Sequence, residues 1–304
     1  MPTSDDLADR TTYPLASRDA NLPATPGHAA IRLHVVEAGP ADGPLVVLLH
    51  GFPEFWYSWR RQIGPLADAG YRVIAPDLRG YGDSDKPDGV ASFEMSHLVA
   101  DVVRLIRWAG REKAHVVGHD WGAVVAWMVA NDHPEVVERL AILNVPHPRV
   151  MWQGLTTVPG QMLRSWYILF FQLPWLPEAI LRRRHGAAIR MMLRREPTRK
   201  DAFTAEDIEK YVEAMLKPGA ARSTVSYYRA ALRGARGTRT RLRRIGMPVQ
   251  VIWGEKDRHL GAWMADPPRD LVPDQRVLRL PDASHWVQND AWEVVNETLI
   301  GFLR

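Results

Sequence analysis

The sequence predicts an α/β protein built on a mostly parallel sheet, and two observations point to it. From residue 31 onward, short apolar runs alternate with helical patterns, which is typical of a sheet covered by helices on both faces. Between residues 146 and 244 this alternation gives way to helical patterns alone, and afterwards it resumes. The pattern therefore predicts one sheet with an inserted helical block.

The predicted strands are short apolar runs followed by turn residues. The run 45–49 is apolar throughout, as expected of a strand that is buried on both faces. The full set of predicted strands is 31–37, 45–49, 73–75, 114–118, 139–143, 249–253 and 276–280. The predicted helices between them are 54–69, 93–109, 123–131 and 291–303.

The same pattern divides the chain into three parts. Residues 1–28 are rich in Pro, Ala, Asp and Thr and are interpreted as an extended lead-in. Residues 29–145 and 245–304 form the predicted core, and residues 146–244 the helical cap, or lid. Ligands of open parallel sheets bind beyond the carboxyl ends of the strands, so a lid at that end covers the site.

Composition excludes several kinds of protein. The chain has 304 residues and no cysteine, so disulfides and thiolate chemistry are excluded. The first nine residues carry acids and no apolar run, and the most apolar stretch, 166–181, is interrupted by Gln172, Pro174 and Pro177. We therefore expect a cytoplasmic protein without a transmembrane segment, as a monomer or a homodimer.

The net charge of +4 is modest, and much of the basic charge lies in residues 182–200. A solvated helical face is the simplest interpretation of such a run, and contact with lipid headgroups or acidic substrates is the lesser alternative. Nothing in the sequence matches a nucleic-acid-binding module. No set of His and carboxylate residues has metal-ligand spacing, so neither a metal nor another cofactor is expected.

The most informative segment is Gly118-His-Asp-Trp-Gly122, which lies between a predicted strand and a predicted helix. It has the form of a nucleophile elbow, a tight strand-to-helix turn, with aspartate in place of the usual serine. The flanking glycines leave room for the close approach of neighbouring strands and helices. An aspartate here is also a common helix N-cap, so the motif alone leaves two interpretations of Asp120 open.

Chain order favours the nucleophile. In a hydrolase triad of this kind the nucleophile, the acid and the histidine follow successive strands in that order. Asp257 and His285 follow the strands 249–253 and 276–280. We therefore assign Asp120 as nucleophile, His285 as general base and Asp257 as the acid that orients the imidazole. Glu255 and Asp282 are weaker candidates for the acid, and His119 is interpreted as a structural hydrogen-bonding residue.

An oxyanion hole requires two backbone N–H groups. Trp121, the residue after the nucleophile, supplies one in this interpretation, and Phe52 in the loop after the strand 45–49 supplies the other. Pro53 has no N–H and is a candidate for a cis peptide bond. His50, at the start of the loop, is expected to stabilise it.

An aspartate nucleophile restricts the substrate. A carboxylate that attacks an activated sp³ carbon forms an ordinary ester, which water then hydrolyses. The natural electrophiles are epoxides and alkyl halides, and the epoxide oxygen needs a proton donor when the ring opens.

Four segments give the chain a specific resemblance to the soluble epoxide hydrolases of the α/β-hydrolase superfamily. They are His50-Gly-Phe-Pro-Glu-Phe-Trp-Tyr-Ser-Trp-Arg60, Asp77-Leu-Arg-Gly-Tyr-Gly-Asp-Ser84, Gly118-His-Asp-Trp-Gly122 and Ser284-His-Trp-Val-Gln288. The resemblance covers residues 30–304. It implies the α/β-hydrolase fold, with a mostly parallel eight-stranded sheet flanked by helices and an inserted helical cap, and hydrolysis of an epoxide to a vicinal diol.

The resemblance also implies two cap tyrosines that donate hydrogen bonds to the epoxide oxygen. The segment 165–172 is similar to the first tyrosine segment of the family and 226–229 to the second, which assigns Tyr167 and Tyr228, with Tyr227 as the fallback. Packing is the alternative role of aromatic residues in a cap. The expected substrate is a small apolar epoxide, in a pocket formed by His50, Pro53, Trp121, Phe171 and Trp286.

Two other functions remain open. A haloalkane dehalogenase shares the Asp, acid and His, but commonly has Asn or Glu where this chain has Phe52, and a fluoroacetate-type dehalogenase needs arginines where Trp121 and Val124 stand. A hydrolase-fold protein that only binds a ligand is the third interpretation, and the intact triad with both tyrosines argues against it.

Overall fold

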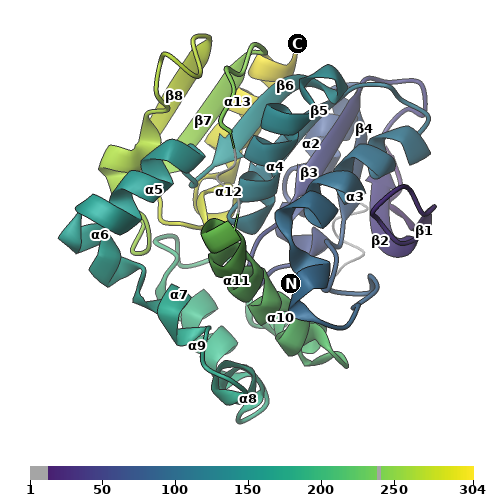
Figure 1. Ribbon diagram of the computed structural model, residues 1–304. Helices are drawn as coiled ribbons and strands as arrows, with labels where there is room; N and C mark the ends of the chain where they lie inside the picture. Colours follow the sequence, from purple (N-terminus) through teal and green to yellow (C-terminus); the bar gives the residue numbers. More distant parts are fainter. Residues whose placement is uncertain (1–12, 238–240) are drawn as a thin grey trace.

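The computed structural model describes residues 13–237 and 241–304, and its centre is an eight-stranded sheet (Figure 1). The order is β1-β2-β4-β3-β5-β6-β7-β8; β2 is antiparallel to both of its neighbours, and all pairs from β4 to β8 are parallel. The predicted eight-stranded, mostly parallel sheet is confirmed. The strands are β1 (Ala16–Leu22), β2 (Ile31–Ala38), β3 (Leu45–Leu49), β4 (Arg72–Pro76), β5 (Ala114–His119), β6 (Val137–Leu143), β7 (Val249–Gly254) and β8 (Gln275–Leu280).

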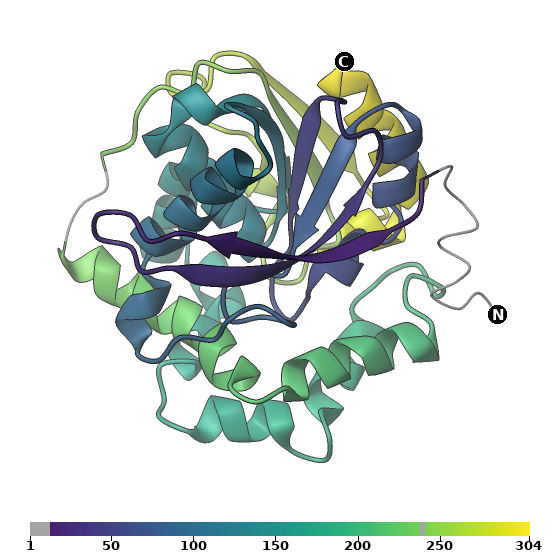
Figure 2. The same ribbon diagram turned by 90° about the vertical axis from the view of Figure 1, so that its right-hand side faces the viewer.

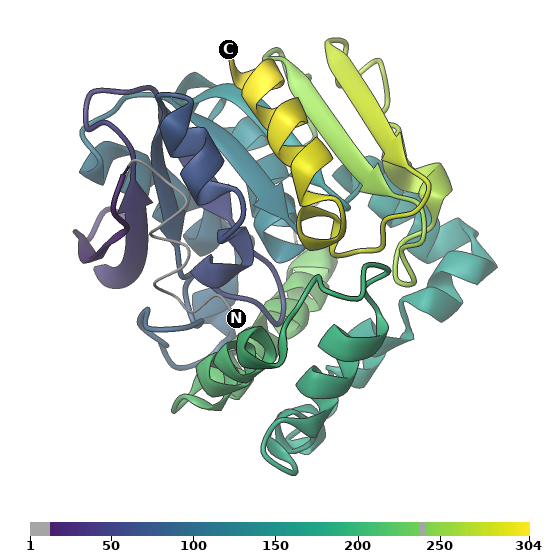
Figure 3. The same ribbon diagram turned by 180° about the vertical axis from the view of Figure 1, so that it is seen from behind.

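Helices cover both faces of this sheet. Figure 1 shows α3 and α4 in front of it, and Figure 3 shows α2 and α13 on the opposite face. The core helices are α2 (Ile63–Asp68), α3 (Met95–Trp108), α4 (Trp121–Asp132), α12 (Val287–Asp290) and α13 (Trp292–Leu303), with short 3-10 helices η1 (Trp56–Trp59), η2 (Val90–Phe93), η3 (Pro134–Val136) and η4 (Ala262–Ala265). No helix of the described residues combines the length and the apolar character that a bilayer crossing requires.

In the described part of the segment between β6 and β7 there are seven helices, and Figure 2 shows them gathered below the sheet. We call them the inserted helices. They are α5 (Pro148–Thr157), α6 (Pro159–Arg164), α7 (Trp166–Phe170), α8 (Leu176–Arg182), α9 (Ala187–Arg195), α10 (Ala205–Leu216) and α11 (Ala220–Gly237).

The central strands are buried on both faces, as their unbroken apolar runs predict. In β3, Val47 and Leu49 pack against the layer that contains α3 and α4, whereas Val46 and Leu48 pack against the layer that contains α2 and α13. All four side chains are fully buried. Alternate residues of a strand point to opposite faces, so this strand contributes to both hydrophobic layers.

The structure adds one strand that the sequence did not predict and divides one predicted helix. Within the extended lead-in predicted over residues 1–28, Ala16–Leu22 form the edge strand β1. This strand is mostly exposed and polar, with only Ala20 and Leu22 buried, so its sequence lacks an apolar signal. The single helix predicted over 54–69 is wrong, because the structure has η1 and then α2 there. Pro65 has no N–H to donate to the carbonyl four residues earlier, which prevents one continuous helix.

The strand register places the predicted site residues at one edge of the sheet. Parallel pairing aligns Leu49 with Gly118, His119 with Leu143 and Leu143 with Ile252. The loops that follow β3, β5, β6, β7 and β8 therefore begin side by side. This is the edge at which open parallel sheets bind ligands.

The turn between β5 and α4 depends on glycine at residue 122. A Cβ atom at Gly122 would lie 2.1 Å from the carbonyl oxygen of Leu49, a backbone atom that cannot swing aside. We expect Gly122→Ala to lower the free energy of unfolding by about 1–3 kcal/mol or more, because overpacking forces the backbone to move. Chemical denaturation measures this change.

Gly160→Ala is the matched control for this prediction. Gly160 also lies in a helix, and a Cβ atom there meets nothing within 4 Å. Its replacement should leave stability unchanged or raise it by up to ~1 kcal/mol, since alanine is the better helix former. Equal stability of the two variants would contradict the steric explanation.

Candidate active site

Asp120 occupies a strained turn directly after β5. Its φ of 47° and ψ of −123° lie outside the helical region, although α4 begins at the next residue. The glycines on either side fit tightly, since a Cβ atom at Gly118 would lie 2.5 Å from the carbonyl oxygen of Gly122. The side chain of Asp120 makes no capping hydrogen bond to α4, so it is not an ordinary helix N-cap. It lines a cavity instead.

The carboxylate of Asp120 faces two groups from neighbouring loops. The backbone N–H of Phe52 donates a hydrogen bond of 2.7 Å to Oδ1, and Nε2 of His285 lies 3.5 Å from Oδ2. The loop can approach this closely because residue 51 is glycine, where a Cβ atom would lie 2.3 Å from Cβ of Asp120. The Phe52–Pro53 peptide bond is cis, as predicted.

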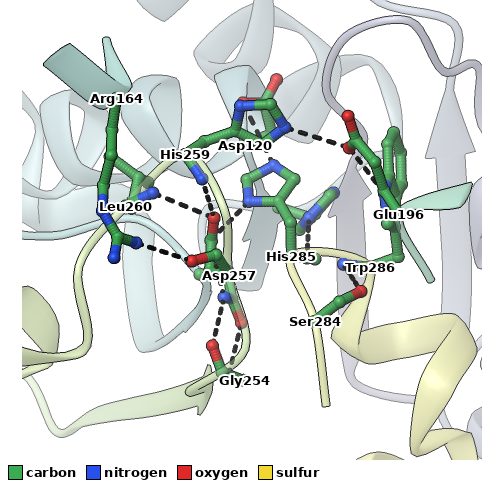
Figure 4. A network of polar contacts seen from close by, with 12 residues as sticks. Asp120, Arg164, Glu196, Gly254, Asp257, His259, Leu260, Ser284, His285 and Trp286 are labelled. Carbon is green, nitrogen blue, oxygen red and sulfur yellow. Dashed lines mark hydrogen bonds and ion pairs between the residues drawn. The ribbon is translucent and has the colours of Figure 1, made fainter. Parts of the chain in front are cut away.

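Figure 4 shows how the three predicted triad residues lie relative to one another. Nδ1 of His285 is 2.7 Å from Oδ2 of Asp257, on the opposite side of the ring from Asp120. The backbone N–H groups of His259 and Leu260 donate to Oδ1 of Asp257 at 2.7 and 2.9 Å. Asp120, His285 and Asp257 thus form a triad in which the imidazole ring contacts one carboxylate on each side.

These contacts shift the ionisation of all three groups. Burial disfavours the charged form of each, but the opposite charges outweigh it. The imidazole of His285 therefore keeps the pKa of Asp120 below its ordinary value and lowers that of Asp257 to about 2. Burial lowers the pKa of His285, yet Asp257 and Asp120 together raise it well above its ordinary value. At neutral pH the resting site is a cation between two anions.

Asn144 is a supporting residue that the sequence interpretation missed. It follows β6, and its side-chain amide donates to Oδ2 of Asp257 at 2.9 Å and to the carbonyl of Gly254 at 3.1 Å. Its side-chain oxygen accepts from the N–H of Gly254 at 2.8 Å. One sequence signal could have identified Asn144: like Asp120, it is a polar residue directly after a predicted strand. It fastens the loop that carries Asp257.

The weaker candidates for the acid lie elsewhere. Glu255 pairs with Arg279 at 3.2 Å, and Asp282 pairs with Lys256 at 2.7 Å on the surface. Neither carboxylate contacts His285. The geometry therefore agrees with Asp257 as the partner of the histidine.

His119 has the structural role that was expected of it. Its Nδ1 lies 2.8 Å from the buried carboxylate of Glu54, and Nε2 bonds to the carbonyl of His285 at 2.8 Å. Glu54 also accepts from the N–H of Gly51 at 3.0 Å, and Gln288 donates to it at 3.1 Å. This buried network joins the loops after β3, β5 and β8.

The cavity beside Asp120 has a volume of about 450 Å³ and is mainly apolar. Tyr167 of α7 and Tyr228 of α11 both line it, and their ring centroids are 5.9 Å apart at 85°. Burial raises the pKa of each tyrosine far above its ordinary value, and the charge of Asp120 adds to the effect. Both phenols are therefore protonated at neutral pH.

Tyr227, the fallback for the second tyrosine, does not line this cavity. Its hydroxyl donates to the carbonyl of Arg79 at 2.7 Å, and its ring packs among Tyr81, Phe93 and Trp121. Adjacent residues of a helix point in directions about 100° apart, so only one of the two tyrosines can face the site.

The structure places the five predicted pocket residues differently. Phe171 and Trp286 line the cavity, but His50, Pro53 and Trp121 do not, whereas Phe52, predicted as an oxyanion-hole donor, does line it. His50 is fully buried, where its Nε2 accepts from the N–H of Leu78 and its Nδ1 donates to the carbonyl of Gly51, so it stabilises the loop. The indole of Trp121 is buried between Tyr227 and Tyr228, and its backbone N–H belongs to the first turn of α4.

The cavity also contains a polar pair that the sequence did not indicate. Nε2 of His259 lies 3.0 Å from the carboxylate of Glu196, and both residues line the cavity. Glu196 follows α9, so this contact joins the inserted helices to the loop of Asp257. The ring centroid of His259 is 5.5 Å from that of Tyr167 and 5.4 Å from that of His285.

Among the described residues, one group has the spacing of metal ligands. It consists of His34, Asp77 and Asp83, whose ligand atoms lie within 4.8 Å of one another. The carboxylate of Asp77 already accepts hydrogen bonds from the N–H groups of Trp56 and Asp83 and contacts Nδ1 of His34. None of the three residues lines the cavity of Asp120.

A nucleophile turn, an acid and a histidine in this order beyond parallel strands define an α/β hydrolase. The chain belongs to the α/β-hydrolase fold family, whose model matches residues 44–291, and it is an epoxide-hydrolase-like member.

The relatives of the chain are similar over most of its length. AB hydrolase superfamily protein YfhM of Bacillus subtilis is 43% identical over 274 residues, which cover 90% of this chain and 95% of that protein. Epoxide hydrolase 4 of Homo sapiens is 35% identical over 281 residues, 91% of this chain and 76% of that protein. The crystal structure of epoxide hydrolase A from Mycobacterium thermoresistibile superposes with a TM-score of 0.81 at 34% identity, covering 95% of this chain and 98% of that one.

The charge of the resting site leads to a prediction about His285. Because its pKa is raised, its ring should stay protonated as the pH rises well past 6.5, the ordinary value. The ion pair should stabilise the fold fully below about pH 6.5, and this stabilisation should be lost as the pH rises through the raised value. A pH titration that follows the ring-nitrogen NMR signals of His285 measures its pKa, and chemical denaturation at several pH values measures the stabilisation.

Two aspartate variants sharpen this experiment. Asp120→Asn removes one of the two carboxylates and should lower the pKa of His285, whereas Asp282→Asn, on the surface, should leave it unchanged. Titration of wild-type His285 near the ordinary value would contradict the proposed cation between two anions.

Proposed function

We propose that the protein hydrolyses an epoxide to a vicinal diol through a covalent ester on Asp120. The observation that carries the proposal is the shared cavity, where Asp120 and His285 of the core meet Tyr167 and Tyr228 of the inserted helices. Residues 146–244 act as a lid in this proposal, because they supply both phenols and close the cavity over the strand ends.

In the first step an oxygen of Asp120 attacks a ring carbon of the epoxide. A C–O bond forms to Asp120, the ring C–O bond breaks, and the epoxide oxygen takes a proton from Tyr167 or Tyr228. The anionic form of Asp120 is available because its pKa is lowered, and the protonated phenols are available because their pKa values are raised. Protonation of the leaving oxygen is general acid catalysis.

Once Asp120 is an ester, its negative charge is gone and only Asp257 still raises the pKa of His285. The histidine can therefore lose its proton, which restores the phenol that gave one up in the first step. In the second step water attacks the carbonyl carbon of the ester, His285 takes a proton from that water, and the N–H groups of Phe52 and Trp121 stabilise the developing oxyanion. The ester C–O bond then breaks, the departing diol oxygen takes the proton from His285, and loss of the remaining carboxyl proton to His285 restores the resting site.

The apolar lining favours a small apolar epoxide as substrate. Phe52, Phe171 and Trp286 contribute aromatic surface, and Leu181 and Met192 contribute aliphatic surface. A structural relative from Bacillus megaterium, 30% identical with a TM-score of 0.83, is described in complex with its product, a naphthyloxy-propanediol. This supports an aryl or alkyl epoxide as the first substrate to test.

Isotope labelling tests the covalent step. In a single turnover in heavy-oxygen water, the label should enter the carboxylate of Asp120 and leave the diol unlabelled, since water attacks the ester at its carbonyl carbon. Mass spectrometry of the diol and of the peptide with Asp120 measures both. Label in the diol at the first turnover would mean direct attack of water on the epoxide.

A histidine variant isolates the second step. His285→Gln should still form the ester but fail to hydrolyse it, so the protein should gain the mass of the epoxide. His133→Gln, at a partly exposed histidine outside the cavity, is the control and should turn over normally. Absence of an adduct in His285→Gln would place the base elsewhere.

The tyrosines have a matched control in the same helix. Tyr167→Phe and Tyr228→Phe should each slow ring opening by roughly 10²–10⁴-fold if both phenols act as proton donors. Tyr227→Phe, one residue from Tyr228 but outside the cavity, should keep the wild-type rate of ring opening. Pre-steady-state kinetics with an aryl epoxide measures these rates, and equal rates in all variants would exclude a role for the phenols.

One pair of substrates separates the proposal from its alternatives. An aryl epoxide should yield diol, and a bromoalkane of similar size should release no bromide. Bromide release would favour a haloalkane dehalogenase. Binding of the epoxide without any product would favour a protein that only binds its ligand.

A further inference from the structure

Exposed apolar side chains are concentrated on the inserted helices. Of the twelve large hydrophobic side chains that are exposed among the described residues, ten belong to residues 152–191. Single exposed apolar residues are common, but a concentration of this kind marks an interaction surface. We call six of them, from α6 to α8, the apolar rim: Leu163, Trp166, Leu169, Trp175, Leu176 and Ile180.

The apolar rim reaches the active-site cavity at two of its residues. Trp166 and Ile180 are exposed and also line the cavity that contains Asp120. Leu169 lies three residues after Trp166 on α7, and Leu176 four residues before Ile180 on α8, so each pair shares one helix face. Figure 1 shows α6, α7 and α8 along the outer edge of the molecule, away from the sheet.

Tryptophan is unusually exposed on this rim. The side chain of Trp175 is 81% exposed and that of Trp166 is 62% exposed. Trp175 also has a φ of 59°, a backbone conformation that bulky residues rarely adopt. Tryptophan is the residue that lipid–water interfaces favour, because its ring is amphipathic.

Unpaired positive charge lies beside the rim. Residues 148–200 contain ten Arg or Lys and two acids, and both acids are bonded within the protein, Glu178 to Arg229 and Glu196 to His259. Five exposed arginines make no ion pair with any described residue: Arg182, Arg183, Arg184, Arg194 and Arg195. One of them, Arg195, lines the cavity together with Trp166 and Ile180.

We propose that this face docks on the surface of an anionic lipid bilayer. The apolar rim enters the boundary between headgroups and acyl chains, and the arginines contact anionic headgroups. The cavity then opens toward the bilayer, so that an apolar substrate dissolved in lipid reaches Asp120 without crossing water. Docking stands independently of the proposed function, whereas delivery of an epoxide rests on it.

A second copy of the chain is the competing occupant, and the charges disfavour it. A two-fold symmetric contact through the rim brings the same surface of both copies together. The five unpaired arginines of one copy would then lie near those of the other, and the rim offers no unpaired acid among the described residues to compensate. A bilayer supplies the opposite charge instead.

Vesicle binding tests the proposal with the full chain. The protein should co-sediment with vesicles of phosphatidylcholine and phosphatidylglycerol at least about tenfold more strongly than with phosphatidylcholine alone, and salt should weaken the binding. Tryptophan fluorescence should shift to shorter wavelength on binding. No binding to the mixed vesicles would overturn the proposal.

A charge variant has a matched control on the core. Replacement of Arg182, Arg183 and Arg184 by glutamate should reduce binding to the mixed vesicles by about tenfold or more. Replacement of Arg107, Lys113 and Arg276 by glutamate changes the net charge equally but on exposed positions of the core, and it should preserve binding. Equal losses in both variants would mean that only net charge matters, which contradicts a docking face.

An apolar variant tests the rim without altering the cavity. Leu163, Leu169 and Trp175 do not line the cavity, so Leu163→Ser, Leu169→Ser and Trp175→Asn should together reduce co-sedimentation with the mixed vesicles by about tenfold or more and leave hydrolysis of a water-dissolved epoxide unchanged. Val294→Ser, an exposed apolar residue of α13, is the control. A concentration-dependent dimer that this variant abolishes, with vesicle binding absent in the wild type, would assign the rim to a second copy.

Discussion

The carboxylate of Asp120 is exposed to the cavity because the backbone around it leaves no other arrangement. Three glycines, at residues 51, 118 and 122, lie where a Cβ atom would come within about 2.5 Å of a neighbouring atom. Their close contacts hold Asp120 at positive φ and keep its side chain away from the amides of α4. The energetic cost of this strained turn is balanced by the fully buried strands on either side. Every other feature of the site depends on this placement.

The negative charge of Asp120 affects the protonation of the other ionisable groups in the site. In the resting state His285 is held as a cation by two aspartates, and two protonated phenols share the cavity with the same anion. In the proposed mechanism, conversion of Asp120 to a neutral ester removes one of the charges that stabilise the imidazolium. That single chemical event would lower the pKa of His285 through the loss of one neighbouring charge.

The two structural parts contribute different kinds of group. The core supplies Asp120, His285 and Asp257, which are fixed by strand ends and by the buried network of Glu54 and His119. The inserted helices supply the phenols and an exposed apolar surface, part of which lines the cavity. Glu196 and His259 connect the two parts at the cavity itself. The cavity that contains Asp120 is therefore lined by both the core and the inserted helices.

The amino-acid sequence was enough to predict seven of the eight strands, the helical insertion and the order of Asp120, Asp257 and His285, because apolar periodicity and the glycine turn are local signals. Three features became visible only in the folded chain: Tyr228 rather than Tyr227 faces the cavity, Asn144 bonds to Asp257, and His50 lies outside the pocket. Side-chain direction and contacts between distant loops depend on tertiary packing, which cannot be predicted from neighbouring residues of the sequence. The polar strand β1 was missed for the related reason that its pairing with β2, rather than its own composition, makes it a strand.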